Sequence, residues 1–145
     1  MFEHRIFRCG ASNFHGDEIA VVNQTHTIDR LQAIADAGFT GIFLCGRLRE
    51  LAPTNLFKEY SAKADERIKE LRKLCRRADK IGLGIWPYFI EPRGLPQTDP
   101  FWQKHPDLRG HCTRIYDFPP ELSLCSSTDQ VRQYLHEGFS ELFQK

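Results

Sequence analysis

The stretch that decides the fold is TIDRLQAIADAGFTGIFLC, residues 27–45. Apolar residues in its first part recur every three or four positions, which predicts an amphipathic helix over residues 27–37 with Thr27 as its N-cap. Gly38 follows where a helix should end, because glycine enters the left-handed conformation without steric cost. The apolar run over residues 39–45 then predicts a buried strand, of the kind that parallel sheets cover on both faces.

The same order of elements extends to both sides of this stretch. Residues 5–9 predict a first strand, residues 61–80 a long amphipathic helix, and residues 83–90 a third strand. Pro87 predicts an edge position or a bulge for that strand, since proline donates no hydrogen bond to a ladder. Alternating strands and helices indicate parallel strands with right-handed crossovers. The predicted fold class is therefore α/β, with about three βα units.

Length decides how much of a larger architecture these units can make. A closed (β/α) TIM-type barrel takes about 250 residues, whereas this chain has 145. We therefore expect a partial, incomplete barrel, and a single domain over residues 1–145 that forms the N-terminal portion of one. Residues 91–126 contain six prolines and predict a long, functional loop. A capping box at residues 127–130 predicts a last helix that runs to the end of the chain.

Composition excludes several classes of function. Lysine plus arginine number 20 and aspartate plus glutamate 19, so no basic footprint for a nucleic acid is expected. Five cysteines without a C-x-x-C pair, and a start without an apolar leader, favour a reduced, cytoplasmic protein. No apolar run approaches the roughly 20 residues of a membrane helix. Neither a nucleotide-loop motif nor metal-ligand spacing is found, so we expect no cofactor and no metal. Cys75 is expected to face the core from its helix.

Candidate site residues follow from the strand order. Ligands of parallel α/β proteins gather beyond the carboxyl ends of the strands. A carboxylate and a guanidinium there can bind adjacent sugar hydroxyls, and an aromatic ring can stack on the apolar face of a sugar. The alternatives are a structural salt bridge for the charged pair and a loop anchor for the aromatic residue. The predicted substrate-binding residues are Asn13, His15, Arg47, Glu91, Arg93 and Trp102.

Residues 68–96, IKELRKLCRRADKIGLGIWPYFIEPRGLP, resemble a known family. They are similar to the part of β-N-acetylhexosaminidase-type glycoside hydrolases in which a helix leads into a third barrel strand ending in a glutamate. Residues 27–47 resemble the second unit of that barrel, and residues 124–143 resemble the helix before its fourth strand. The segments EPRGLP, FWQKHPDLRG and LCSST also resemble uncharacterised bacterial barrel proteins related to these hydrolases. The histidine of the family's Pro-Gly-His ending is absent here.

The resemblance implies a carbohydrate-active protein with a carbohydrate ligand. In that family an Asp-Glu pair at the end of the fourth strand carries catalysis, through the substrate's own acetamido group. The only Asp-Glu pairs of this chain, at residues 17–18 and 65–66, are not placed to substitute. We therefore expect the isolated chain to be inactive.

Two alternatives belong to other classes of function. The first is a non-catalytic carbohydrate-binding or assembly module, in which a homo-oligomer covers the open edge of the sheet. The second is an unrelated small α/β enzyme that uses the long loop as a lid. A further strand within residues 110–125 would favour this enzyme.

Overall fold

The computed structural model describes residues 3–8, 18–114 and 120–144. The chain divides into two compact units. Unit 1 comprises residues 1–46 and 63–89, and unit 2 comprises residues 47–62 and 90–145. We predict that these two units belong to one domain, and this stays a prediction.

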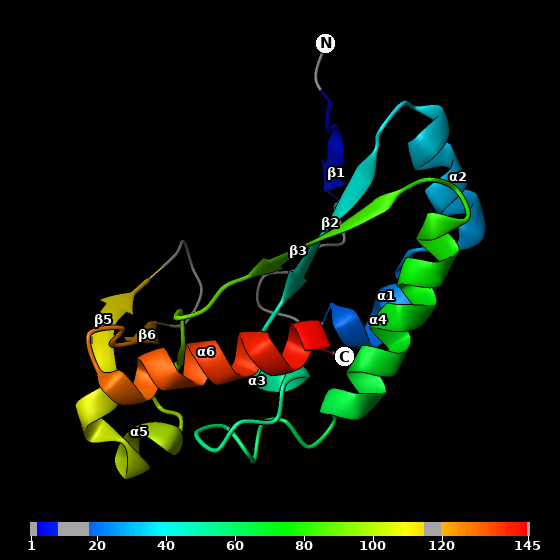
Figure 1. Ribbon diagram of the computed structural model, residues 1–145. Helices are drawn as coiled ribbons and strands as arrows, with labels where there is room; N and C mark the ends of the chain where they lie inside the picture. Colours follow the sequence, from blue (N-terminus) through cyan, green and yellow to red (C-terminus); the bar gives the residue numbers. More distant parts are fainter. Residues whose placement is uncertain (1–2, 9–17, 115–119, 145) are drawn as a thin grey trace. The chain divides into compact units, whose positions relative to one another are not determined.

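Unit 1 contains a parallel three-stranded sheet, as the sequence predicts (Figure 1). Its strands lie in the order β1-β2-β3, and β2 pairs in parallel with both neighbours. Pro87 lies on β3, which pairs with β2 alone among the described strands, so the edge position predicted for this proline is confirmed. The elements of unit 1 are β1 (Ile6–Arg8), the 3-10 helix η1 (Ile19–Val21), α1 (Val22–Thr25), α2 (Ile28–Asp36), β2 (Gly41–Gly46), α4 (Ala64–Asp79) and β3 (Gly84–Phe89).

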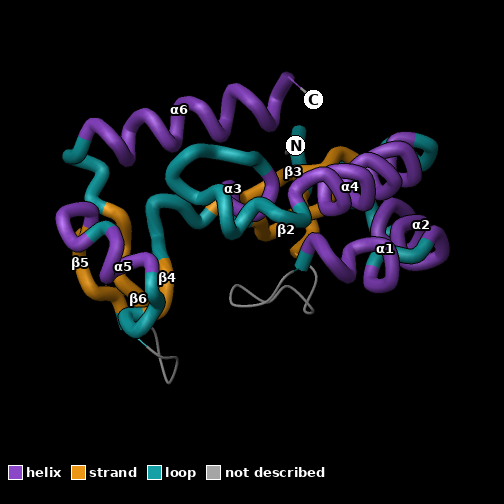
Figure 2. Tube along the Cα trace, turned by 90° about the horizontal axis from the view of Figure 1, so that it is seen from below, coloured by secondary structure: helices purple, strands orange, loops and turns teal. Residues whose placement is uncertain are grey.

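The helices of unit 1 gather on one side of this sheet (Figures 1 and 2). Thr27 caps α2 as predicted, because its side chain accepts a hydrogen bond from the backbone N–H of Arg30. Gly38 ends the turn after α2 with a φ of 81°, the conformation for which glycine is suited. Ile42 and Leu44 of β2 are almost fully buried. The local signals around residues 27–45 thus predicted this part of the fold correctly.

The buried face of α4 differs from the prediction at Cys75. Its buried residues are Ala64, Ile68, Leu74 and Ala78, whereas Cys75 is exposed. Positions 74 and 75 both fit the helical repeat, because they lie four and three residues before the buried Ala78, and both spacings bring residues to one side of a helix. Leu74 occupies the core position because it removes more apolar surface from water than a thiol does. The prediction that Cys75 faces the core is therefore wrong.

His26 is a buried titratable group at the end of α1, with an exposed fraction of 1 %. Its Nδ1 lies 2.9 Å from Thr25 Oγ1 and 3.2 Å from the carbonyl oxygen of Val22. Burial lowers the pKa of His26, although the hydrogen bond with Val22 partly opposes this, and the positive charges of Arg30 and Arg77 lower it further. His26 is therefore neutral in the folded protein at a pH where it is already protonated in the unfolded chain.

We expect His26 to make the stability of the protein depend on pH. Its folded-state pKa is lowered, so the unfolded state binds the proton first as the pH falls. Its contribution is complete above the unfolded pKa of about 6.5 and is lost as the pH falls through the folded pKa, with a slope of about 1.4 kcal/mol per pH unit at most. Urea denaturation between pH 7.5 and 4.5, compared with His26→Gln, measures the difference in slope. Equal slopes for the two proteins would contradict this prediction.

Unit 2 contains an antiparallel sheet where the sequence predicts a long loop. Its strands lie in the order β4-β6-β5. Each strand is short, and β4 pairs with a distant strand, since Leu95 lies opposite Leu122, which is 27 residues later in the chain. The prediction of a structureless segment over residues 91–126 is therefore wrong. The elements of unit 2 are α3 (Leu48–Leu51), β4 (Leu95–Pro96), α5 (Phe101–Lys104), the 3-10 helix η2 (Pro106–Leu108), β5 (Arg109–Thr113), β6 (Glu121–Leu124) and α6 (Asp129–Gln144).

Aromatic rings form the core of unit 2. The Phe57 ring stacks on Phe101, with centroids 4.7 Å apart, and meets the Tyr134 ring edge-on at 4.8 Å. Trp102 is also buried, and its indole N–H donates to the carbonyl oxygen of Pro96. Tyr134 lies on α6, the last predicted helix, so this core joins α6 to α5 and to the 52–63 segment.

The fold is mixed α/β, and no closed barrel is formed within the described ranges. β6 and all but the first residue of β5 lie within residues 110–125, where a strand would favour a small α/β enzyme. They pair antiparallel with each other in unit 2 and do not extend the parallel sheet. No helix among the described residues is long and apolar enough to cross a membrane.

Candidate functional site

Two of the predicted site residues, Asn13 and His15, lie outside the described residues. The other four make internal contacts in unit 2. Arg47 Nη1 donates to Glu50 Oε1 at 3.1 Å, and Arg93 Nε lies 3.3 Å from Glu121 Oε2. Trp102 is 1 % exposed. Their assignment as substrate-binding residues stays a prediction, and these contacts favour the structural alternatives.

Glu91 lies in a buried cluster with Arg49 and Tyr134. The side chain of Glu91 is 0 % exposed and that of Arg49 is 3 % exposed. Glu91 Oε1 accepts from Arg49 Nη1 at 3.4 Å, from the Arg49 backbone N–H at 3.4 Å and from the Tyr134 hydroxyl at 3.2 Å. Arg49 Nη2 also donates to the carbonyl oxygen of Gly94 at 2.8 Å. This Arg49–Glu91–Tyr134 cluster ties α3, α6 and the segment before β4 together.

The electrostatics of the cluster agree with a structural role. Burial raises the pKa of Tyr134, and the negative charge of Glu91 raises it further, so the hydroxyl stays protonated and donates. Glu91 Oε2 is buried and has no hydrogen-bond partner among the described residues. A carboxylate held in this way is enclosed by the protein and cannot reach a ligand in solvent without breaking the ion pair.

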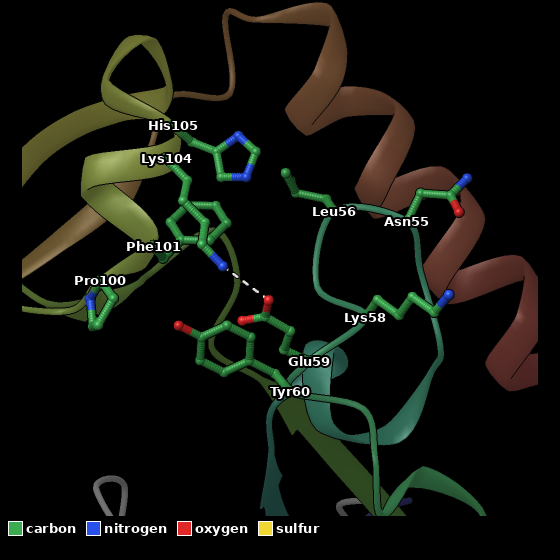
Figure 3. Close-up of a pocket in the computed structure, with 9 residues that line it drawn as sticks. All are labelled: Asn55, Leu56, Lys58, Glu59, Tyr60, Pro100, Phe101, Lys104 and His105. Carbon is green, nitrogen blue, oxygen red and sulfur yellow. Dashed lines mark hydrogen bonds and ion pairs between the residues drawn. The ribbon is translucent and has the colours of Figure 1, made fainter.

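One accessible pocket of unit 2 lies elsewhere, between the 52–63 segment and α5 (Figure 3). Its volume is about 220 Å³, below the roughly 300–1,000 Å³ of sites for drug-sized ligands. It therefore has room for one small ring. The lining residues are Asn55, Leu56, Lys58, Glu59, Tyr60, Pro100, Phe101, Lys104 and His105.

Aromatic side chains form one part of this pocket. The ring centroids of Phe101 and His105 are 4.7 Å apart, and the rings are tilted by 35°. Tyr60 meets Phe101 edge-on at 6.4 Å, and its hydroxyl donates to Asp99 Oδ1 at 2.5 Å. Asp99 also accepts from the backbone N–H of Phe101, at the start of α5. Burial and this hydrogen bond raise the pKa of Tyr60, so Tyr60 is a fixed, neutral part of the wall.

A charged pair lies beside these rings in the pocket. Lys104 Nζ lies 2.8 Å from Glu59 Oε1, and Figure 3 shows this ion pair running from α5 to the 52–63 segment. The two side chains are 59 % and 76 % exposed. An ion pair this exposed contributes roughly 0–1 kcal/mol, so a ligand can separate it at little cost. The pair offers one donor and one acceptor side by side.

Other chemistry has less support within the described part of the chain. No group of three histidine, cysteine, aspartate or glutamate side chains that could hold a metal ion is found there. Cys45 is buried, and the described cysteines are free thiols. The pocket therefore offers rings and hydrogen-bonding groups for binding, and we assign no nucleophile to it.

Sequence reasoning missed most of this pocket. None of its lining residues is among the predicted substrate-binding residues. Lys104 and Glu59 are 45 residues apart, and no local pattern joins them. The sequence feature that indicates the pocket is the group of aromatic residues within 101–105. It lies in a proline-rich segment, and that composition is typical of a loop.

Comparisons of this chain with protein-family models, with curated proteins and with solved structures each found no match.

Proposed function

We propose that this chain is a carbohydrate-binding protein and that the 220 Å³ pocket of unit 2 holds one sugar ring. The observation that carries this proposal is the combination of ring faces with an exposed, adjacent donor and acceptor in one small pocket. This combination supports a non-catalytic carbohydrate-binding module, one of the alternatives from the sequence, more directly than it supports a hydrolase.

The chemistry of a pyranose matches both parts of the pocket. Its C–H face is apolar and packs on the π-system of an aromatic ring, which the half-buried Tyr60 and His105 provide, whereas Phe101 is buried and already stacks on Phe57. Its hydroxyl groups both donate and accept hydrogen bonds. Lys104 has only donors and the ionised Glu59 only acceptors, so the pair can bind two neighbouring hydroxyls in complementary directions.

Binding should depend on the Lys104–Glu59 pair. We expect Lys104→Met to weaken the binding of a preferred monosaccharide by about tenfold, because a hydrogen bond to a charged group contributes roughly 1.5–3 kcal/mol. Glu59→Gln should have a similar effect. Isothermal titration calorimetry of the full chain with glucose, galactose, mannose and N-acetylglucosamine measures it.

Lys73→Met is the matched control, because Lys73 is another exposed lysine that pairs with a glutamate, Glu70 on α4, and it does not line the pocket. It should bind like the unaltered chain. The proposal fails if the unaltered chain binds none of these sugars, or if Lys104→Met binds as the unaltered chain does.

A second candidate is the hexosaminidase-type barrel that the sequence resembles. The specific observation in its favour is the parallel β1-β2-β3 sheet with α4 between β2 and β3, which is the order of elements in a (β/α) barrel. As part of such a barrel, the chain would lack the catalytic Asp-Glu strand. Assay of the isolated chain on aryl N-acetylhexosaminides should then show no turnover, and turnover that Glu91→Ala abolishes would overturn this view.

A further inference from the structure

A second pocket of unit 2 lies beside the first. Its volume is about 420 Å³, and it lies between the 52–63 segment and the last turns of α6. No aromatic side chain lines it, in contrast to the first pocket. The lining residues are Pro53, Thr54, Asn55, Lys58, Glu137, Ser140, Glu141 and Gln144.

The two pockets share Asn55 and Lys58 as a common wall. Both side chains are exposed, and Figure 3 shows them extending away from the aromatic part of the first pocket. The Asn55 amide and the Lys58 ammonium group have no hydrogen bond or ion pair within the described part of the chain. These two solvent-exposed side chains lie at the boundary, where they can bind a group that continues from one pocket into the other.

We infer that the ligand is a neutral oligosaccharide of at least two sugar residues, with one ring in each pocket. This inference rests on the proposed function. The ring in the first pocket packs on the half-buried rings of Tyr60 and His105, whereas the next ring is held by hydrogen bonds alone. The hydroxyl of Ser140 and the amide of Gln144 supply donors and acceptors to its hydroxyl groups.

The charges of the second pocket argue for a neutral ligand. Glu137 and Glu141 contribute two carboxylates and Lys58 one ammonium group, which gives a net charge of −1 by formal count. A sugar that carries a carboxylate or a sulfate there would be repelled, because like charges at short range are unfavourable. Uncharged hydroxyl and acetamido groups carry no such penalty.

The test is whether the binding affinity rises with the number of sugar residues in the ligand. Titration calorimetry on the full chain compares glucose with cellobiose and maltose, and N-acetylglucosamine with its β-1,4-linked dimer. We expect the better disaccharide to bind on the order of tenfold more tightly than its monosaccharide, because the second ring adds several hydrogen bonds. The double variant Ser140→Ala/Gln144→Ala should lose this gain and bind the monosaccharide unchanged.

His136→Ala is the matched control, since His136 is exposed on the same helix and lines neither pocket. It should keep the full gain. Equal affinity for monosaccharide and disaccharide, or a gain that the double variant retains, would overturn the inference while leaving the proposed function intact. If no sugar in the series binds, both the proposed function and this inference fail.

Discussion

Glu91→Leu is expected to lower the free energy of unfolding by about 3–5 kcal/mol, because it leaves the Arg49 guanidinium buried without its counter-charge. The Arg49 side chain is 3 % exposed and holds Glu91 Oε1 at 3.4 Å. It cannot recover hydration without opening unit 2. The Tyr134 hydroxyl also loses its acceptor, which adds the cost of an unsatisfied buried donor. Urea denaturation followed by circular dichroism measures the loss.

The same cluster predicts strong coupling between its members. Arg49→Met should be about as destabilising as Glu91→Leu, whereas the double variant Arg49→Met/Glu91→Leu should recover much of the loss, because apolar pairs of similar volume often replace buried ion pairs without cost. Adding Tyr134→Phe removes the remaining unsatisfied hydroxyl. Strictly additive effects of the single changes would show that the ion pair does not hold these elements together.

Glu59→Gln serves as the control for charge removal. Glu59 forms an ion pair with Lys104 in the same unit, but its side chain is 76 % exposed. Its loss should change stability by less than about 1 kcal/mol, because water replaces the partner at little cost. The contrast between the two glutamates separates the effect of burial from that of charge.

Gly94→Ala is the second change with a large expected effect. A Cβ atom at Gly94 would lie 1.6 Å from the carbonyl oxygen of Leu122, which is backbone and cannot move aside. Leu95, the next residue, pairs with Leu122 in the sheet of unit 2. We expect a loss of more than about 4 kcal/mol, the range in which backbone displacement rather than local repacking is required.

Gly84→Ala is the matched control, because its Cβ would come within 3.2 Å of the Trp86 side chain, which is 40 % exposed, rather than of a backbone atom. Thermal denaturation compares the stabilities of both variants. Amide hydrogen exchange then locates the damage, which should appear in β4 and β6 for Gly94→Ala and be absent there for Gly84→Ala. Native stability of Gly94→Ala would contradict the close approach of the two strands.

Local signals predicted unit 1 well because each of its elements is encoded within a short window. The helical spacing after Thr27, the glycine at 38 and the apolar run that follows act over neighbouring residues. Parallel pairing then follows from the alternation of strands and helices. The error at Cys75 arose where two adjacent positions fit the helical repeat equally well and only packing chose between them.

Unit 2 was predicted poorly because its structure depends on partners far apart in the chain. The strands of its sheet are too short, and too rich in proline and glycine nearby, for their own composition to indicate pairing. Residues that the sequence indicated as ligand-binding therefore make internal contacts in the folded chain. Glu91 was chosen for its place after a strand, yet Arg49, 42 residues earlier, encloses it in an ion pair.

The sequence by itself determined the α/β class, the parallel strands of unit 1 and the long helices, since periodicity and capping act locally and survive without tertiary context. Only the tertiary structure decided which polar groups are accessible. It buried Glu91 against Arg49 and Tyr134, and it brought Lys104 to Glu59 beside the rings of Tyr60 and Phe101. Burial and proximity are properties of the folded chain, because they depend on contacts between residues that are distant in sequence.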